Sequence, residues 1–175
     1  MRTVRPGPDE FDAYYAKYID GVPDGDIVET LAVQWLETRD LLAAGAAGLE
    51  QHRYAPDKWT LRESVGHVVD TERVFTHRAL WFARGGTDPL PGMDQDAWAP
   101  ASNADARSLA KHLAEWQAVR GGLVALLDGL PEAAWSAAGT ASGVRVTVRA
   151  LAWMIAGHER HHRGLWRDAY GVGGE

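Results

Sequence analysis

Four long segments of this 175-residue chain place apolar residues at the three- and four-residue spacing of an α-helix. Segments rich in Gly, Pro, Asp and Asn separate them, and they cover residues 24–48, 60–84, 103–128 and 147–170. One continuous stripe in the first segment consists of Ile27, Leu31, Trp35, Thr38 and Leu42. Each apolar stripe needs a partner surface, so we predict an all-α four-helix bundle, with a connectivity that the spacing leaves open.

The stretches around these helices carry their own local signals. Thr60 and Glu63 have the spacing of a capping box, which marks the start of the second helix. We expect a short N-terminal helix within residues 9–20, one turn at 131–135, and a turn or small hairpin at 139–146. Residues 87–102 contain three prolines and are expected to form a long irregular loop between helices two and three. Loops of this length are often functional.

Charge and apolar content exclude several classes of protein. Eighteen Lys and Arg against 24 Asp and Glu leave a net charge of −6, which offers no basic face for nucleic acid. The chain contains no run of about 18 apolar residues, so we expect no membrane span. The first residues, MRTVRPGPDE, lack the apolar stretch of a secretory signal. We therefore expect a cytoplasmic protein with one domain at residues 1–175 and a core at about 24–170.

Cysteine is absent from the chain. This excludes disulfides, thiolate metal ligands and a cysteine nucleophile together. Any metal ion must therefore be held by nitrogen and oxygen atoms.

Two histidines of the fourth segment are spaced to act together. His158 and His162 lie four residues apart, so both rings leave the same helix face one turn apart. That face also carries the apolar stripe, and two such imidazoles can chelate one divalent cation. His67 lies at the edge of the stripe of the second segment and is the third candidate ligand. Hydrogen-bonded or solvent-facing histidines would show the same spacing, so spacing alone leaves the metal site open.

Three of the other four histidines, His52, His77 and His112, have no partner at metal-ligand spacing. We expect His52, His77 and His112 to lie on the surface, and His161 to flank the pair of candidate ligands.

The sequence around the three candidate ligands resembles a known family. The relevant motifs are Trp-Thr-Leu-Arg-Glu at 59–63, Gly-His-Val-Val-Asp-Thr-Glu-Arg at 66–73, Leu-Pro-Gly-Met-Asp-Gln-Asp at 90–96 and Ala-Gly-His-Glu-Arg-His-His at 156–162. Over about residues 24–170 the chain is similar to the DinB/YfiT-like superfamily. The resemblance implies a four-helix bundle of unusual connectivity and one divalent metal held by His67, His158 and His162. Three imidazoles suit zinc, nickel, iron or manganese without choosing among them.

The resemblance also implies a class of chemistry. Some family members are transferases or isomerases that use small thiols, so we expect a small-thiol-dependent S-transferase acting on an electrophilic small molecule. The thiol would be a cosubstrate, because the chain has no cysteine. A hydrolase using metal-bound hydroxide is the first alternative. A non-catalytic metal-binding or dimerisation module is the second, and family members often form homodimers.

Glu72 falls on the apolar stripe of the second segment. A carboxylate at such a position is unusual unless it is paired or functional. We predict that Glu72 is the general base or a group that orients a ligand. An internal ion pair with Arg73, Arg78 or Arg149 is the alternative.

Three further polar residues are candidates for the surroundings of the site. Asp70 and Glu159 lie close in sequence to ligand histidines and are expected to hold them in the correct tautomer. Gln95 belongs to the long loop and is expected to line the mouth of the pocket. Plain solvation of the loop explains Gln95 equally well.

Overall fold

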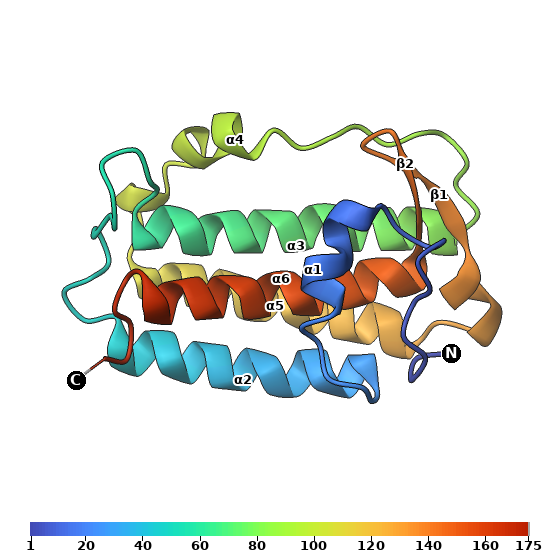
Figure 1. Cartoon of the computed structure of the whole chain (residues 1–175), viewed down its shortest axis with the longest axis horizontal. Helices are drawn as coiled ribbons and strands as arrows, with labels where there is room; N and C mark the ends of the chain where they lie inside the picture. The colour runs from blue at the N-terminus through green and yellow to red at the C-terminus, as the bar shows by residue number, and fades with distance from the viewer. Residues whose placement is uncertain (175) are drawn as a thin grey trace.

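A polar side chain caps the start of every long helix. The computed structural model describes residues 1–174, and its long helices are α2 (Ile27–Gly45), α3 (Leu61–Ala83), α5 (Leu109–Asp128) and α6 (Val148–Asp168) (Figure 1). The side chains that accept hydrogen bonds from first-turn amides are those of Asp26, Thr60, Ser108 and Thr147. The capping box predicted at Thr60 and Glu63 is confirmed.

The long helices form a bundle in which α2 lies opposite α3. Helix α3 packs against α5 and α6, and α2 packs against the same two helices. The chain that follows α3 returns along the length of the bundle before α5 begins, so α3 and α5 point in the same direction (Figure 1). Helices α2 and α6 point the other way. The predicted all-α four-helix bundle is confirmed, and this long return connection sets its topology.

The shorter elements follow most of the local signals. The N-terminal segment forms a 3₁₀ turn, η1 (Ala13–Tyr15), followed by α1 (Ala16–Ile19). One 3₁₀ turn, η3 (Glu132–Ser136), precedes an antiparallel hairpin of β1 (Ala138–Ala141) and β2 (Val144–Thr147). In this hairpin Ala138 pairs with Thr147 and Ala141 with Val144.

The connection between α3 and α5 differs from the expected irregular loop. It contains a helix, α4 (Gln95–Ala101), because the Asp94 side chain accepts hydrogen bonds from the amides of Asp96 and Ala97. A 3₁₀ turn, η2 (Ala104–Ala106), follows Asn103, whose φ of 52° lies in the left-handed region. This break explains why the next helix begins at Leu109 and not near residue 103.

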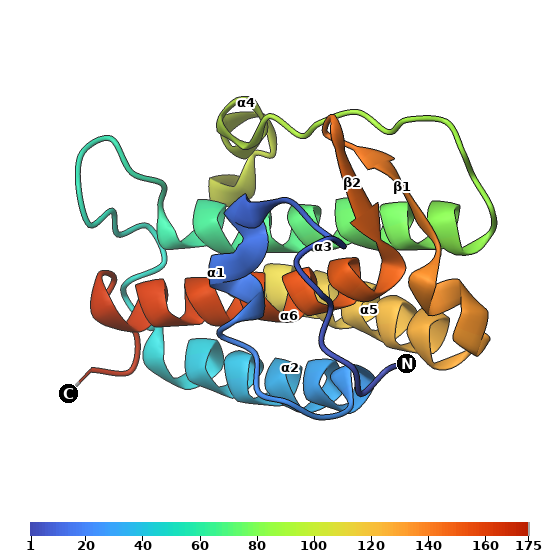
Figure 2. The ribbon, with the colours of Figure 1, turned by 45° about the vertical axis from the view of Figure 1, so that its right-hand side comes forward.

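A glycine lets α1 lie directly on α6. A Cβ atom on Gly157 would lie 2.1 Å from the carbonyl oxygen of Tyr18, so only glycine allows this approach. Helix α1 crosses the bundle at this point (Figure 2). The contact brings the Tyr18 ring to 5.5 Å from the ring of His158, measured between centroids.

The apolar core consists of two clusters. One contains Phe75, Phe82 and Trp153, and the other contains Trp116 and Trp166. Along α3 and α6, residues between the two clusters include buried charged and imidazole side chains. The bundle therefore holds a polar layer across its interior, and the candidate site lies in this region.

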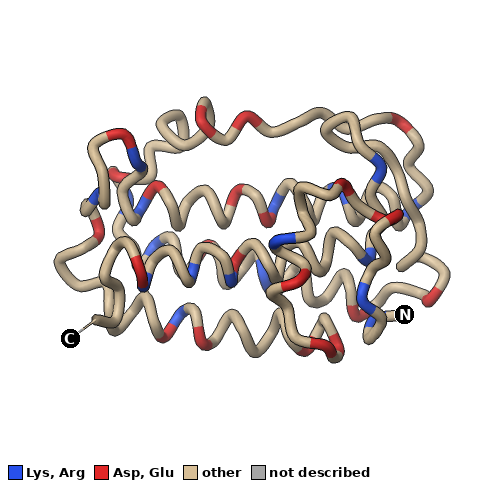
Figure 3. Tube along the Cα trace, viewed as in Figure 1, with Lys and Arg blue, Asp and Glu red and all other residues tan. Residues whose placement is uncertain are grey.

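Charges of both signs occur on each of the four long helices (Figure 3). Among the described helices, none is both long enough and apolar enough to span a bilayer.

Candidate metal centre

The bundle brings together the three histidines that are separated by up to 95 positions in the sequence. His67 comes from α3, and His158 and His162 come from successive turns of α6. One ring nitrogen from each residue can be chosen so that all three lie within 4.8 Å of one another. The Nε2 atoms of His67 and His158 are 3.2 Å apart.

Burial keeps these imidazoles neutral. Each of the three side chains is less than a tenth exposed. Desolvation lowers the pKa of His67 to about 4. Desolvation and repulsion by neighbouring histidines hold the pKa of His158 and of His162 well below 6.5. Neutral rings have a free lone pair, which is the form that binds a metal ion.

Two hydroxyl groups on α3 lie beside candidate ligand histidines. The Oγ atom of Ser64 is 3.4 Å from Nδ1 of His162, and Oγ1 of Thr71 is 3.5 Å from Nδ1 of His67. Ser64 also accepts a hydrogen bond from the indole nitrogen of Trp166, at 2.9 Å. Outer hydrogen bonds of this kind orient ligand histidines. Sequence reasoning missed both residues, although their positions three before and four after His67 place them on the same helix face.

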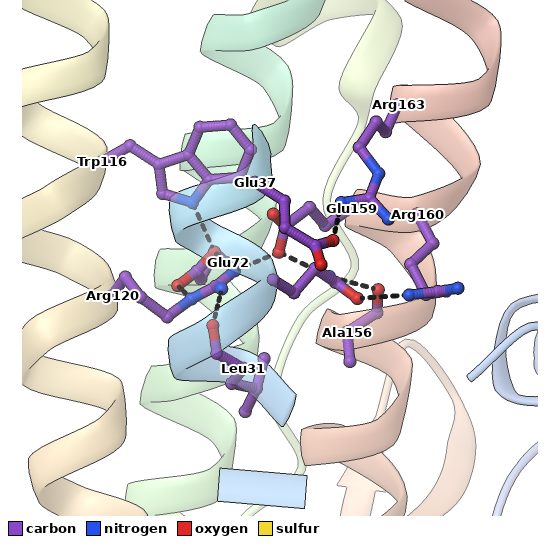
Figure 4. Close-up of polar contacts among 10 residues, drawn as sticks. Leu31, Glu37, Glu72, Trp116, Arg120, Ala156, Glu159, Arg160 and Arg163 are labelled. Carbon is purple, nitrogen blue, oxygen red and sulfur yellow. Dashed lines mark hydrogen bonds and ion pairs between the residues drawn. The ribbon is translucent and has the colours of Figure 1, made fainter. Parts of the chain in front are cut away.

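Glu72 belongs to a buried ion network (Figure 4). Arg120 of α5 donates to both oxygens of Glu72, at 2.7 and 2.8 Å, and the Trp116 indole donates to Oε2 at 2.7 Å. Arg120 also donates to Glu159 at 2.8 Å. Glu72 thus forms an internal ion pair, which was the alternative interpretation. Its partner is Arg120, however, and is not one of the three arginines that we expected. A role of Glu72 as general base stays a prediction.

The structure places the other candidate residues in different surroundings. Oε2 of Glu159 accepts hydrogen bonds from Arg120 and Gln34, and Oε1 has no partner among the described residues. Asp70 pairs with Arg73, at 3.4 Å, and burial raises the pKa of Asp70 above 3.8. Neither carboxylate contacts a ligand ring through a hydrogen bond within residues 1–174. Their roles in setting a tautomer stay predictions.

The surface position expected for His112 is wrong. Its ring is buried, and Nε2 lies 3.0 Å from the carbonyl oxygen of Ala104. The 3₁₀ turn before α5 supplies this partner, and helical spacing gives no sign of that turn. His52 and His77 are exposed as predicted, and His161 packs edge-on against Tyr18 beside the site.

Two cavities reach the histidine cluster from different sides. The first has a volume of about 310 Å³, is reached by His67 and His158, and is also lined by Tyr14, Tyr15, Tyr18, Thr71, Phe75, Arg78, Gly92, Met93, Gln95 and Ser142. The second has a volume of about 220 Å³, is reached by His162 and Ser64, and is also lined by Tyr54, Trp59 and Asp96. Gln95 thus lines the same cavity as two candidate ligands. The histidines lie between the two cavities.

The residues present fit a divalent metal ion. Two nitrogen ligands of a tetrahedral ion with bonds of about 2.0–2.1 Å lie about 3.3 Å apart. The 3.2 Å between the Nε2 atoms of His67 and His158 matches this spacing. Three neutral imidazoles, two of them with an outer hydroxyl partner, form the usual surroundings of a site with open coordination positions.

The fold and the histidines together define a class of protein, four-helix bundles with a three-histidine centre between facing helices. Residues 30–165 match the family model of the DinB superfamily, and this chain belongs to that superfamily. Among solved structures it is similar to YfiT from Bacillus subtilis, described as a probable metal-dependent hydrolase with an unusual four-helix bundle topology. The TM-score is 0.70 at 18% identity, over 92% of this chain and 88% of that one.

At this identity the likeness to YfiT shows the fold alone. A search of curated proteins finds no match to this chain.

Proposed function

We propose that this protein is a metal-dependent enzyme that joins a small thiol to an electrophilic small molecule. His67, His158 and His162 would hold the divalent ion, which is zinc, nickel, iron or manganese by the chemistry of the donor set. When bound, such an ion supplies positive charge that lowers the pKa of a thiol or water beside it.

One observation carries the choice of a transferase. A transfer reaction needs two organic reactants at one centre, and the three histidines lie between two cavities. A thiol in one cavity and an electrophile in the other could approach the centre together. A hydrolase requires only one organic substrate and water.

The residues of the first cavity support this chemistry in a second way. Its lining contains no aspartate or glutamate among the described residues, whereas Asp57 and Asp96 line the second cavity, so an electrophile in the first cavity meets hydrogen-bond donors and no carboxylate. Burial raises the pKa of Tyr18, so its phenol keeps its proton and can donate a hydrogen bond to an oxygen of the electrophile. The sulfur then forms the new bond to carbon as the bond between that carbon and its leaving group breaks. The leaving group departs with the bonding electron pair, as chloride does from a chlorinated electrophile, and the thiol proton goes to solvent.

Metal content tests the centre itself. We expect elemental analysis of the purified protein to find about one divalent ion per chain, and the variant His158→Ala to lose it. His77→Ala is the matched control, because His77 lies on α3 but is exposed. A protein free of metal, or retention of the metal by His158→Ala, would overturn the three-histidine centre.

Thiol conjugation tests the reaction. Monochlorobimane and chlorodinitrobenzene serve as electrophiles, each with glutathione, bacillithiol, mycothiol and cysteine in turn. We expect turnover with at least one thiol, lost in His158→Ala and kept in His77→Ala. If no thiol supports turnover while esters or amides are cleaved, the protein is a hydrolase. If neither reaction occurs in the metal-loaded protein, the non-catalytic alternative holds.

A further inference from the structure

Arg78 is a buried arginine on the wall of the first cavity. It is 4% exposed and lines this cavity together with His67 and His158. Arg78 follows His67 by eleven residues on α3, which brings it back to the same helix face about 16 Å further along the axis. The same cavity thus has a cation at one end and the histidine cluster at the other.

No carboxylate compensates this cation within residues 1–174. Its Nη2 donates to the carbonyl oxygen of Pro91, at 2.8 Å, and to Oγ of Ser142, at 2.9 Å. Both acceptors are neutral, and the desolvated guanidinium has its pKa lowered. Arg120 is equally buried but pairs with two carboxylates. A buried charge without a counter-charge is costly, so Arg78 is in an unusual state.

The two remaining nitrogens of Arg78 are open to a ligand. Nε and Nη1 donate to no described residue, and neither is among the unpartnered atoms that are closed to solvent. Anchoring the loop at Pro91 and the hairpin at Ser142 uses only Nη2. Because Nε and Nη1 lie on different edges of the guanidinium, a carboxylate would accept a charge-assisted hydrogen bond from one of them, and such bonds are about twice as strong as neutral ones.

We propose that Arg78 binds a carboxylate on one of the reactants, so that the other end of this molecule lies at the three-histidine centre. The assignment of this molecule as a reactant rests on the proposed function. The backbones of Arg78 and His67 are about 16 Å apart along α3, and the guanidinium lies 5.4 Å from the centroid of the Phe75 ring, which is about one turn closer to His67. A ligand that spans the rest of this separation is longer than acetate. The first cavity, of about 310 Å³, has room for a chain of this kind.

Calorimetry on the metal-free protein tests the carboxylate site without any need for turnover. The probes are acetate, octanoate and the neutral analogue octanamide. We expect octanoate to bind the unmodified protein about tenfold more tightly than octanamide, and about tenfold more tightly than it binds Arg78→Met. Acetate should bind weakly to both proteins.

Arg73→Met is the matched control, because Arg73 lies on the same helix but is exposed and pairs with Glu115. It should bind octanoate as the unmodified protein does. Circular dichroism shows whether Arg78→Met folds. If it does not, the affinity of Arg78→Lys for octanoate and the comparison of octanoate with octanamide in the unmodified protein test the proposal instead. Equal affinity for octanoate and octanamide, or octanoate binding that is unchanged in a folded Arg78 variant, would overturn the proposal.

Turnover then shows which reactant carries the carboxylate. If the thiol is the reactant that binds Arg78, KM in Arg78→Met should rise for carboxylate-bearing thiols. If the electrophile binds Arg78, KM should rise for carboxylate-bearing electrophiles. A KM that rises for neither class would contradict the role in the reaction. The calorimetric result stands independently if the protein is found not to be a transferase.

Discussion

At the scale of single residues, the polar layer of the core is organised by Arg120. Its guanidinium joins Glu72 of α3 to Glu159 of α6, the two helices that carry the candidate ligands, and also donates to the carbonyl oxygen of Leu31 on α2. One cation therefore faces two buried carboxylates. Removal of the cation leaves both carboxylates uncompensated, whereas neutralising Glu72 leaves one cation and one anion.

This difference predicts unequal effects of two substitutions. Arg120→Met should lower the free energy of unfolding by about 3–5 kcal/mol, because it leaves two buried carboxylates without their partner. Glu72→Gln keeps the shape and the ability to accept hydrogen bonds, and should cost about 1–2 kcal/mol. Urea denaturation of the metal-free proteins measures both values. A loss in Glu72→Gln as large as that in Arg120→Met would contradict this account of the charges.

The same Glu72→Gln variant tests the role of general base. If Glu72 acts only through the ion network, metal content and turnover per folded molecule should stay within about twofold of the unmodified protein. A general base contributes about 100-fold or more. Loss of turnover on that scale with the metal retained would favour the catalytic role.

At the scale of elements, Gly157 controls how α1 sits on the bundle. Gly157→Ala places a methyl group against the backbone of Tyr18, so α1 must move away. We expect a loss of about 1–3 kcal/mol in unfolding free energy, and weaker binding in the first cavity because Tyr18 lines it. Gly164→Ala is the control on the same helix, since open space surrounds that glycine. It should stabilise the protein by up to about 1 kcal/mol.

The N-terminal segment is tied to the start of α6 through Glu10, and this contact should depend on pH. Burial raises the pKa of Glu10, but hydrogen bonds and charge from Arg149, with bonds from Gly7 and Thr147, lower it to a net value below 4.5. Because the folded pKa is below the unfolded one, the carboxylate stabilises the fold above about pH 4.5, and this contribution falls as pH drops through the folded pKa.

Glu10→Gln should therefore be less stable than the unmodified protein by about 1–2 kcal/mol at pH 7, with the difference shrinking towards pH 3. Urea titrations at several pH values measure this difference. A difference that stays constant from pH 7 to pH 3 would show that the charge of Glu10 does not contribute.

At the scale of the whole molecule, the predictable features were those with a local cause. The capping box at Thr60 and the glycines after α3 and α6 mark helix ends without reference to the rest of the chain. The pairing of Glu72 with Arg120 spans 48 residues and depends on how α5 lies beside α3, which helical spacing does not specify. Two histidines of the site could be paired by spacing, whereas the position of His67 on its helix made it only a candidate third ligand, and the family resemblance was needed to join it to the pair.

A bound metal ion should act on the stability of the whole bundle, since its ligands come from α3 and α6. Unfolding separates these ligands, so the ion binds the folded state in preference. At a free concentration of 100 times Kd, this adds about 2.7 kcal/mol, or about 5–10 °C in Tm for a domain of this size. Thermal unfolding with and without zinc or nickel, after removal of metal by a chelator, measures the shift. We expect His162→Ala to lose this shift in Tm and His77→Ala to keep it, because the exposed ring of His77 lies outside the cluster. An equal shift in both variants would place the ion elsewhere. The absence of any shift in the unmodified protein would contradict a centre that joins the two helices.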